Sequence, residues 1–287
     1  MENLSIVVLH YKTPDILAHC LYRLRRYVPK AQLIVVDTGG DLASLQERFS
    51  AYPEVSWCKT INHSMANGVN QGLKRAERDY VAHMNADLYI EAETFPRLLE
   101  VLKEPDVGLV GPLNMTPAGQ PQPMGLLYHA NYRRLRSKRD ISVSWLAGCL
   151  QVTRRDLLLE VGGLNSSMRF YNEDIEWCWR IRQAGYRCHL VNTKVLHLGG
   201  SATPAKADFL IEGYRGGRVL LMNYRPRLML HSQMHIVLLI AAVLRRWGKP
   251  LEKEAFEVIE EMFKRQAFDE SPFGATLAEN NNDFLRD

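Results

Sequence analysis

The fold of this chain is indicated first by residues 4–14, Leu-Ser-Ile-Val-Val-Leu-His-Tyr-Lys-Thr-Pro. Leu4–Leu9 is a short apolar run typical of a buried strand, and Thr13-Pro14 predicts a helix cap followed by proline at the first helical position. The next apolar residues recur at helical spacing, at Leu17, Leu21, Leu24 and Val28. A buried strand followed directly by an amphipathic helix predicts the first unit of an α/β sheet.

The same alternation of apolar runs and amphipathic stretches continues along the chain. Further strands are predicted at Leu33–Val36, Tyr80–Met84, Val107–Val110 and Arg187–Val191. Helices are predicted at Ser64–Ala76, Thr94–Lys103 and Glu173–Ala184, the last closed by Gly185. Strands that alternate with helices predict a sheet connected by crossover helices.

Residues 112–140 interrupt this pattern with four prolines, two glycines and the basic run Arg133–Arg139. We predict a long loop here, and a loop of this length in a compact domain is usually functional or mobile. The basic run is interpreted either as a clamp for phosphates or an acidic acceptor, or as a solvated charge run. The residues leave both interpretations open.

Beyond about residue 205 the pattern changes to helices without intervening strands. Ile236–Leu244 contains nine consecutive apolar residues, which span about 14 Å as a helix, whereas a bilayer crossing needs roughly 20 residues. The basic segment Arg245–Lys249, which contains Trp247, follows directly. Two interpretations remain open, a helix lying in a membrane interface and a helix buried in the protein.

The composition is that of an ordinary globular protein, with 46% apolar residues, 24% charged residues and a net charge of +4. So small a positive excess, without a recognisable motif, argues against a nucleic-acid partner and fits an anionic small molecule or anionic lipid. The five cysteines contain no C-x-x-C pair, which indicates buried or free thiols in a reducing compartment. The N-terminal residues resemble no signal peptide, so we expect a cytoplasmic location.

Polar residues follow two of the predicted strands at their carboxyl ends, where open α/β sheets bind ligands. Asp37 is interpreted either as a contact to a nucleotide's base or ribose, or as a turn residue that bonds its own backbone. Asn85-Ala86-Asp87 carries an amide and a carboxylate two residues apart, which therefore point toward the same opening. Such oxygen ligands suit Mg²⁺ or Mn²⁺ bridging a diphosphate.

A cluster of acidic residues begins a predicted helix at Asn172-Glu173-Asp174-Ile175-Glu176-Trp177. Capping is one explanation, because the helix dipole stabilises acids in the first turn. Three carboxylates beside aromatic residues exceed what capping requires, and such a carboxylate can orient a sugar hydroxyl and take its proton. Farther along, His197 precedes a Gly199-Gly200-Ser201 bend and is a lone histidine, interpreted as structural or as a ligand.

In this order and at this spacing, the segments resemble family 2 glycosyltransferases, particularly the bacterial rhamnosyltransferase-like branch. The resemblance covers about residues 4–225. The matching segments are Ser5–Tyr11, Val35-Val36-Asp37, Asn62 through Asn70-Gln71-Gly72, Met84–Asp87, Trp145–Gly148, Glu173–Glu176, and His197 with Ser201.

The resemblance implies an α/β fold of the GT-A type, with a mixed, mostly parallel sheet flanked by helices. It implies a catalytic domain at residues 1–205, with a nucleotide-sugar half at about 1–111 and an acceptor half at about 112–205. A helical C-terminal extension is expected at residues 206–287.

The resemblance also implies roles for single residues. Asp174 resembles the general base, with Glu173 as its rival, and Asp87 with His197 resembles the ligands of a Mg²⁺ or Mn²⁺ ion. The nucleotide-sugar site is expected at Tyr11, Asp37, Asn70, Asn85, Ala86 and Asp87. The acceptor region is expected at Trp145, Gly148 and Trp177.

The implied reaction is transfer, with inversion, of one hexose or rhamnose from a nucleoside-diphosphate sugar to a glycan or glycolipid acceptor. The chain lacks a Q-x-x-R-W signature, so one addition is expected rather than processive synthesis. Its place would be cell-surface polysaccharide or glycolipid assembly, in the cytoplasm or in peripheral contact with the inner face of the membrane.

Two other classes of function remain as alternatives. A sugar nucleotidyltransferase would need a Gly-rich phosphate loop after the first strand, and His10–Pro14 lacks the glycines. A non-catalytic member of the same fold would bind a nucleotide sugar or a partner without turnover. The presence of both Asp87 and Asp174 argues against that second alternative.

Overall fold

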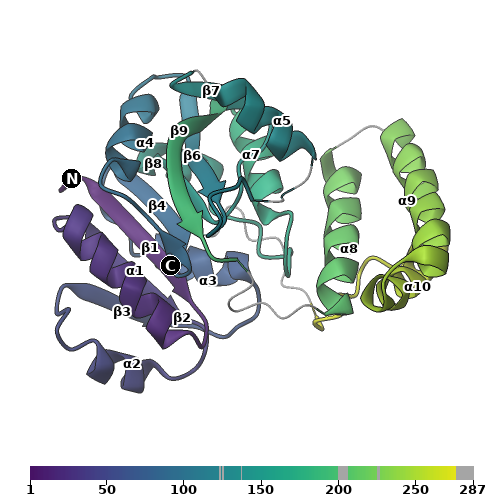
Figure 1. Cartoon of the computed structure of the whole chain (residues 1–287), viewed down its shortest axis with the longest axis horizontal. Helices are drawn as coiled ribbons and strands as arrows, with labels where there is room; N and C mark the ends of the chain where they lie inside the picture. The colour runs from purple at the N-terminus through teal and green to yellow at the C-terminus, as the bar shows by residue number, and fades with distance from the viewer. Residues whose placement is uncertain (123, 125, 137, 200–205, 225–226, 276–287) are drawn as a thin grey trace.

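The computed structural model describes residues 1–122, 124, 126–136, 138–199, 206–224 and 227–275. Within these residues, a nine-stranded sheet covered by helices on both faces forms the body of the protein. Three helices, α8 to α10, pack beside that body in the C-terminal part (Figure 1). The predicted α/β fold with a helical C-terminal extension is therefore confirmed.

The sheet is mixed and runs in the order β3-β2-β1-β4-β8-β6-β9-β5, with β7 beside β9. The strands are β1 Leu4–His10, β2 Gln32–Asp37, β3 Val55–Lys59, β4 Tyr80–Asn85, β5 Leu88–Tyr89, β6 Val107–Met115, β7 Asp140–Val143, β8 Leu150–Arg154 and β9 Arg187–His197. Strands β1 to β4 pair in parallel, as do β6 and β9, whereas β8 is antiparallel to both β4 and β6. Most of the paired residues lie in parallel pairs, as predicted.

The helices connect these strands and continue beyond the last of them. Their bounds are α1 Pro14–Tyr27, α2 Leu42–Arg48, α3 Met65–Leu73, α4 Thr94–Leu102, α5 Leu126–Leu135, α6 Arg155–Val161, α7 Glu173–Gln183, α8 Ala207–Tyr224, α9 Arg227–Trp247 and α10 Pro250–Arg265. The start of α3 is capped as its sequence suggests, because the Ser64 hydroxyl accepts from the backbone N–H of Asn67 at 3.0 Å. Thr13 makes no such side-chain cap at α1.

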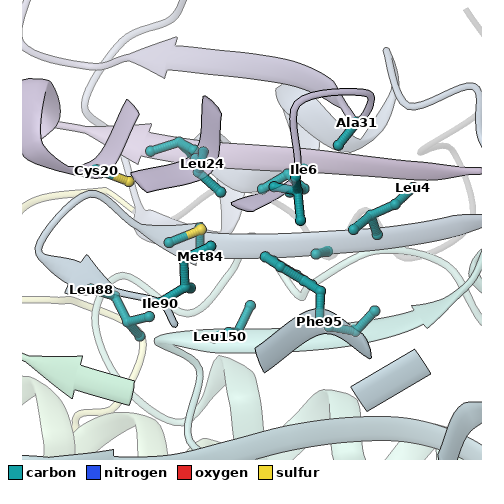
Figure 2. Close-up of a cluster of buried hydrophobic side chains, with 14 of the residues drawn as sticks. Leu4, Ile6, Cys20, Leu24, Ala31, Met84, Leu88, Ile90, Phe95 and Leu150 are labelled. Atoms are coloured by element: carbon teal, nitrogen blue, oxygen red, sulfur yellow. The ribbon is translucent and has the colours of Figure 1, made fainter. Parts of the chain in front are cut away.

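The central strands are buried on both faces because consecutive positions are apolar. On one face Ile6 and Val8 pack beneath α1, in a cluster that continues to Phe95 of α4 (Figure 2). On the other face Val7 packs against α3. Helix α3 approaches the sheet so closely that a Cβ on Gly72 would lie 2.2 Å from Val7 Cγ1, so position 72 favours glycine.

The prediction of one long loop over residues 112–140 is wrong. Strand β6 runs on to Met115, helix α5 occupies Leu126–Leu135, and β7 pairs with β9. Pro112 is tolerated inside β6 because the register with β9 shifts between Gly111 and Leu113, and proline is found in strands where the ladder is interrupted. The sequence predicts that β6 ends at Val110, because the dipeptide Gly111-Pro112 is typical of a turn.

The C-terminal helices form an apolar core of their own. This core is built from Ala207 and Ile211 of α8, Val237 and Ala241 of α9, and Ala255, Phe256, Ile259, Met262 and Phe263 of α10, with Phe268. Helix α8 stands between the sheet and the α9–α10 pair (Figure 1). The Asn172 side chain before α7 donates to the carbonyl of Gly213 in α8 at 3.1 Å, which ties the two parts together.

One face of helix α9 is buried in the C-terminal core, and another face leaves apolar side chains exposed. Val237 and Ala241 are buried against α8 and α10, whereas Ile236, Leu239 and Trp247 are 57%, 68% and 71% exposed. No helix in the described part of the chain is both long and apolar enough to span a membrane. Residues 276–287, the end of the expected helical extension, lie outside the described residues.

Candidate active site

A cleft of about 1470 Å³ opens at the carboxyl ends of the central strands and reaches the C-terminal helices. The residues that line it at the sheet follow β1, β2 and β4, namely Tyr11, Thr13, Thr38, Asn85, Ala86 and Asp87. Glu173 at the start of α7 and His197 at the end of β9 line it as well. Polar groups predicted from separate segments therefore meet in one cleft.

Asp87 and His197 are brought together by the short strand β5. Leu88 of β5 pairs with His197 of β9, and the backbone N–H of Leu198 donates to the carbonyl of Asp87 at 3.0 Å. The two side chains converge as a result, with Asp87 Oδ1 3.3 Å from His197 Nε2. On its other side, His197 Nδ1 lies 2.7 Å from Gln122 Oε1, so the ring is oriented by a partner outside the pair.

The Asp87–His197 pair is chemically suited to a divalent cation. A carboxylate oxygen and an imidazole nitrogen 3.3 Å apart can contact one ion, and this donor set suits Mn²⁺ or Mg²⁺. A proton held on Nδ1 by Gln122 leaves Nε2 as the ligand atom, the usual second partner of a metal-binding histidine. Among the described residues, no group of three or more His, Cys, Asp or Glu side chains is placed to hold a metal ion, so substrate oxygens would complete the coordination.

The electrostatics of His197 reflect its acidic neighbour. Burial alone would lower the pKa of His197, but hydrogen bonds to Asp87 and Cys149 outweigh it and raise that pKa to about 10. The imidazolium and the Asp87 carboxylate therefore form an ion pair in the absence of a cation. A cation bound at this pair must displace that proton, so its binding strengthens as pH rises.

The two adjacent acids at the start of α7 have different surroundings. Glu173 is 4% exposed, lines the cleft and leaves its Oε2 without a hydrogen-bond partner among the described residues. Burial and the charge of Asp174 raise the pKa of Glu173 to about 8. Glu173 thus lies where it can reach a ligand in the cleft, and its raised pKa suits proton transfer near neutral pH.

Asp174 is held firmly by its neighbours instead. Its Oδ2 accepts from Trp145 Nε1 at 3.0 Å and from the backbone N–H of Gly148 at 2.9 Å, and its Oδ1 accepts from the N–H of Ile175 at 2.8 Å. Burial raises the pKa of Asp174 although these hydrogen bonds oppose the rise. Of the pair, Glu173 is among the residues that line the cleft and Asp174 is not.

Backbone strain is concentrated at the rim of the cleft. Tyr171 and Asn172, directly before Glu173, have φ angles of 66° and 71°, and Lys12 between the cleft residues Tyr11 and Thr13 has a φ of 51°. Such left-handed conformations are costly for residues other than glycine and persist where the surrounding structure enforces them. Here the turn at Tyr171-Asn172 aims the first residues of α7 at the cleft.

Asp37 lies beneath the cleft rather than in its lining. Its carboxylate accepts from the backbone N–H groups of Gly39, Gly40 and Asp41 at 2.9 to 3.1 Å, the arrangement of a turn-forming aspartate. His10 Nδ1 lies 3.1 Å from the same carboxylate. The neighbouring Thr38, which the sequence interpretation did not select, lines the cleft in its place.

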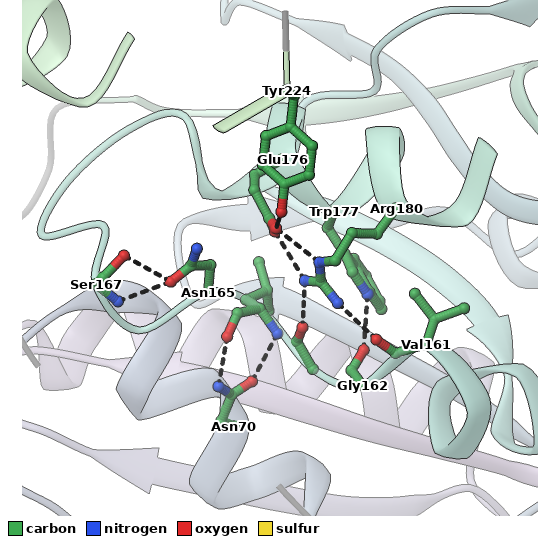
Figure 3. A network of polar contacts seen from close by, with 11 residues as sticks. Asn70, Val161, Gly162, Asn165, Ser167, Glu176, Trp177, Arg180 and Tyr224 are labelled. Atoms are coloured by element: carbon green, nitrogen blue, oxygen red, sulfur yellow. Dashed lines mark hydrogen bonds and ion pairs between the residues drawn. The ribbon is translucent and has the colours of Figure 1, made fainter. Parts of the chain in front are cut away.

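Asn70 and Trp177, two further predicted site residues, make hydrogen bonds to the backbone of nearby loops in this structure (Figure 3). The Asn70 amide donates to the carbonyl of Leu164 at 2.7 Å and accepts from its N–H at 2.9 Å, which fixes the loop before α7. Trp177 is 1% exposed and donates from Nε1 to the carbonyl of Gly162. Trp145 and Gly148 contact Asp174, as described above, and Ser201 lies outside the described residues.

Several lining residues gave no signal in the sequence. Gln122 comes from the segment taken for a loop, and nothing in its local pattern marks it as a partner of His197. Phe209 and Phe273 come from two further segments and meet Phe170, one of the aromatic residues beside the acidic cluster, in the cleft wall, with ring centroids 4.8 to 5.5 Å apart. Only the tertiary fold brings such residues together.

Comparisons with known proteins agree with this architecture. The model of the family described as Glycosyl transferase family 2 matches residues 5–162, more than half of the chain. The low-salt glycan biosynthesis hexosyltransferase Agl10 of Haloferax volcanii is 23% identical over 197 residues, which are 64% of this chain and 62% of that protein. The pre-mycofactocin glycosyltransferase of Mycobacterium tuberculosis is 27% identical over 183 residues, 57% of this chain and 37% of that protein. This chain thus spans less than two thirds of the length of these relatives.

Solved structures share the fold at low sequence identity. A crystal structure of GalNAc-T7 with UDP, GalNAc and Mn²⁺ has a TM-score of 0.64 at 14% identity, and covers 93% of this chain and 57% of that one. The mannosyltransferase PcManGT from Pyrobaculum calidifontis, in complex with GDP-Man and Mn²⁺, has a TM-score of 0.60 at 17% identity, covering 93% of this chain and 84% of that one. The predicted GT-A fold is confirmed by these likenesses.

Proposed function

Because this chain belongs to glycosyl transferase family 2, we propose that it moves a single sugar, a hexose or rhamnose, from a nucleoside-diphosphate sugar to a hydroxyl acceptor with inversion at the anomeric carbon. The observation that supports this proposal best is the meeting of the Asp87–His197 pair and Glu173 in one cleft at the carboxyl ends of the strands. The pair suits the diphosphate end of a donor, and the acid suits the acceptor hydroxyl.

In this proposal the residues of the cleft have separate tasks. Asp87 and His197 would hold Mg²⁺ or Mn²⁺, and the bound ion would offset the negative charge that grows on the departing nucleoside diphosphate. Tyr11, Asn85 and Ala86 border the same end of the cleft and would contact the nucleotide or its sugar. The solved neighbours that carry UDP or GDP-Man with Mn²⁺ support this part of the proposal.

One displacement step requires one base. The acceptor oxygen forms a bond to the anomeric carbon while the bond from that carbon to the diphosphate breaks, and the acceptor proton passes to a carboxylate. We assign this carboxylate to the Glu173–Asp174 pair. The position of Glu173 in the cleft lining supports Glu173, and the resemblance to family 2 supports Asp174, with Trp145 and Gly148 holding it in place.

The test is a nucleotide-release assay with UDP-, GDP- and dTDP-sugars, each with and without Mn²⁺. We expect metal-dependent release from one nucleotide class and loss of that release in Asp87→Asn. Asp156→Asn is the matched control, because the Asp156 side chain is 79% exposed and remote from the cleft lining. Release from none of the donors would favour a non-catalytic binding protein, and release that is equal in Asp87→Asn would remove Asp87 from the site.

We also propose that the protein works on the cytoplasmic face of a membrane, in peripheral contact, during cell-surface polysaccharide or glycolipid assembly. Helix α9 carries no acidic residue between Arg227 and Trp247, and it ends in Arg245, Arg246 and the exposed Trp247. A basic helix with an exposed apolar stripe and an interfacial tryptophan is attracted to anionic lipid. Flotation with anionic vesicles, reduced in Leu239→Gln/Trp247→Ala, is the expected result, and unchanged flotation would contradict it.

A further inference from the structure

The cleft continues well beyond the proposed donor and base residues. The same cleft is lined by the aromatic cluster Phe170, Phe209 and Phe273 and by the α9 residues Ile236, Val237 and Ile240, with Gln233 and Glu252 as polar neighbours. The lining is mostly apolar, so an acceptor whose hydroxyl lies at Glu173 shares the cleft with a large apolar surface. A small hydrophilic acceptor would leave this surface uncovered.

We infer that this part of the cleft binds the hydrocarbon chain of an amphipathic lipid acceptor, whose hydroxyl-bearing head lies at Glu173. The inference rests on the proposed glycosyltransferase function and names its acceptor class. We call the surface formed by Phe209, Phe273, Leu210, Ile236 and Ile240 the chain site.

The composition of the chain site favours a hydrocarbon over a second sugar. Aromatic rings alone stack on sugars as readily as on chains, but Leu210, Ile236 and Ile240 offer only aliphatic surface. Aliphatic side chains gain from contact with methylene groups and supply no hydrogen bonds for hydroxyl groups, which would lose their water on entering. Gln233 and Glu252 also line this part of the cleft, but most of its lining is apolar, which favours a hydrocarbon chain over an oligosaccharide.

The position of the chain site indicates where such a chain comes from. Ile236 and Ile240 line the cleft, while Leu239, Val243 and Trp247 of the same helix are exposed at 68%, 42% and 71%. One helix thus presents an apolar stripe to the cleft and a neighbouring apolar stripe outward. Arg246 lies at the end of the outer stripe and its charge complements anionic headgroups, whereas Arg245 is paired with Glu260 of α10. The chain site and the outward apolar stripe therefore lie on the same helix.

The test uses alkyl maltosides, which join a sugar head to a chain of chosen length. Binding of methyl, hexyl and decyl β-maltoside to the full chain is measured by calorimetry below their micelle-forming concentrations, with maltotetraose as the chain-free comparison. We expect affinity to rise about fourfold per methylene group as the chain fills the site. Affinity that is independent of chain length, or maltotetraose binding as tightly as the decyl compound, would overturn the inference.

Variants on α9 locate the binding. Ile236→Gln and Ile240→Gln should each weaken decyl maltoside binding about tenfold. Leu239→Gln is the matched control on the outer stripe and should change it by less than about twofold, because Leu239 is absent from the cleft lining. Ile236 is 57% exposed, so its substitution leaves the fold intact. Equal weakening by Leu239→Gln would place the chain elsewhere.

Donor binding separates this inference from the function on which it rests. Nucleotide-sugar binding by the same Ile236→Gln protein should equal that of the wild type. Donor binding without chain-dependent maltoside binding would overturn the chain site alone. Chain-dependent binding without any donor binding would overturn the proposed function and leave a lipid-chain site in the cleft.

Discussion

The buried acid Glu173 should make the protein less stable as the pH rises, and Glu173→Gln should remove that loss. The folded-state pKa is about 8, above the ordinary value of 4.5 that applies to the unfolded chain. Between these values the folded state holds a proton that the unfolded state has released, so the free energy of unfolding falls with increasing pH. From pH 4.5 to pH 7 the fall amounts to about 3 kcal/mol, at about 1.4 kcal/mol per pH unit.

The assay is urea denaturation of the wild type and Glu173→Gln at pH 5, 6, 7 and 8. Near pH 5 the two proteins should be about equally stable, because the wild-type acid is protonated and isosteric with the amide. At pH 7 the variant should be more stable by about 2–3 kcal/mol. Parallel stability curves over the whole range would refute the reasoning, since they would mean that Glu173 is solvated.

Glu176, a second buried acid on α7, should respond to the same substitution in the opposite way, with a loss of stability. Glu176 is fully buried, but it accepts from Arg180 at 2.7 and 2.8 Å and from the hydroxyl of Tyr224 at 2.6 Å (Figure 3). Glu176→Gln leaves the Arg180 guanidinium without its counter-charge, so the free energy of unfolding of this variant should be lower by about 3 kcal/mol at pH 7.

If Glu173 is also the base, kcat/KM should rise about tenfold per pH unit up to the pKa of Glu173 and then level.

Three other substitutions separate catalysis from structure. Asp174→Asn should abolish transfer while leaving donor affinity unchanged; full turnover in this variant, together with loss in Glu173→Gln, would place the base at Glu173. Asn70→Ala should lower the free energy of unfolding by about 2 kcal/mol, because both hydrogen bonds to Leu164 are buried, and a change confined to donor affinity in calorimetry would show a binding role instead. Gly72→Ala should lower the melting temperature, since its Cβ would collide with Val7; an unchanged melting temperature would show that α3 can move away.

Strands β1, β2 and β4 of the nucleotide half are legible from sequence because each is a mostly apolar run with a turn or cap at its end, whereas β3 and β5 were not predicted, because β3 alternates with exposed residues and β5 has only two residues. β1, β2 and β4 begin and end within a residue or two of their predicted bounds. The segment that was misread, 112–140, fails for local reasons. Pro112 sits at a register shift that only the pairing with β9 makes tolerable, and β7 is four residues long with just Ile141 and Val143 facing inward.

The site is legible in part for a similar reason. Asp87 and Glu173 follow recognisable element boundaries, so their residue types stand out against the pattern around them. The sequence does not decide which way each of these side chains faces. Asp37 has the same local pattern whether it faces a nucleotide or its own turn, and Asn70 looks the same whether it contacts a ligand or Leu164. Partners such as Gln122 are selected by distance in space, which no local pattern contains.

The central claim, that the Asp87–His197 pair holds a nucleotide-sugar through a divalent cation, is tested most directly by thermal unfolding with a donor panel. UDP-, GDP- and dTDP-sugars are each added with and without Mn²⁺ or Mg²⁺. The account predicts that one nucleotide class stabilises the protein only when metal is present, by about 2.7 kcal/mol at a hundred times its dissociation constant. That stabilisation should disappear in Asp87→Ala. Stabilisation by none of the donors, or equal stabilisation of Asp87→Ala, would contradict the claim.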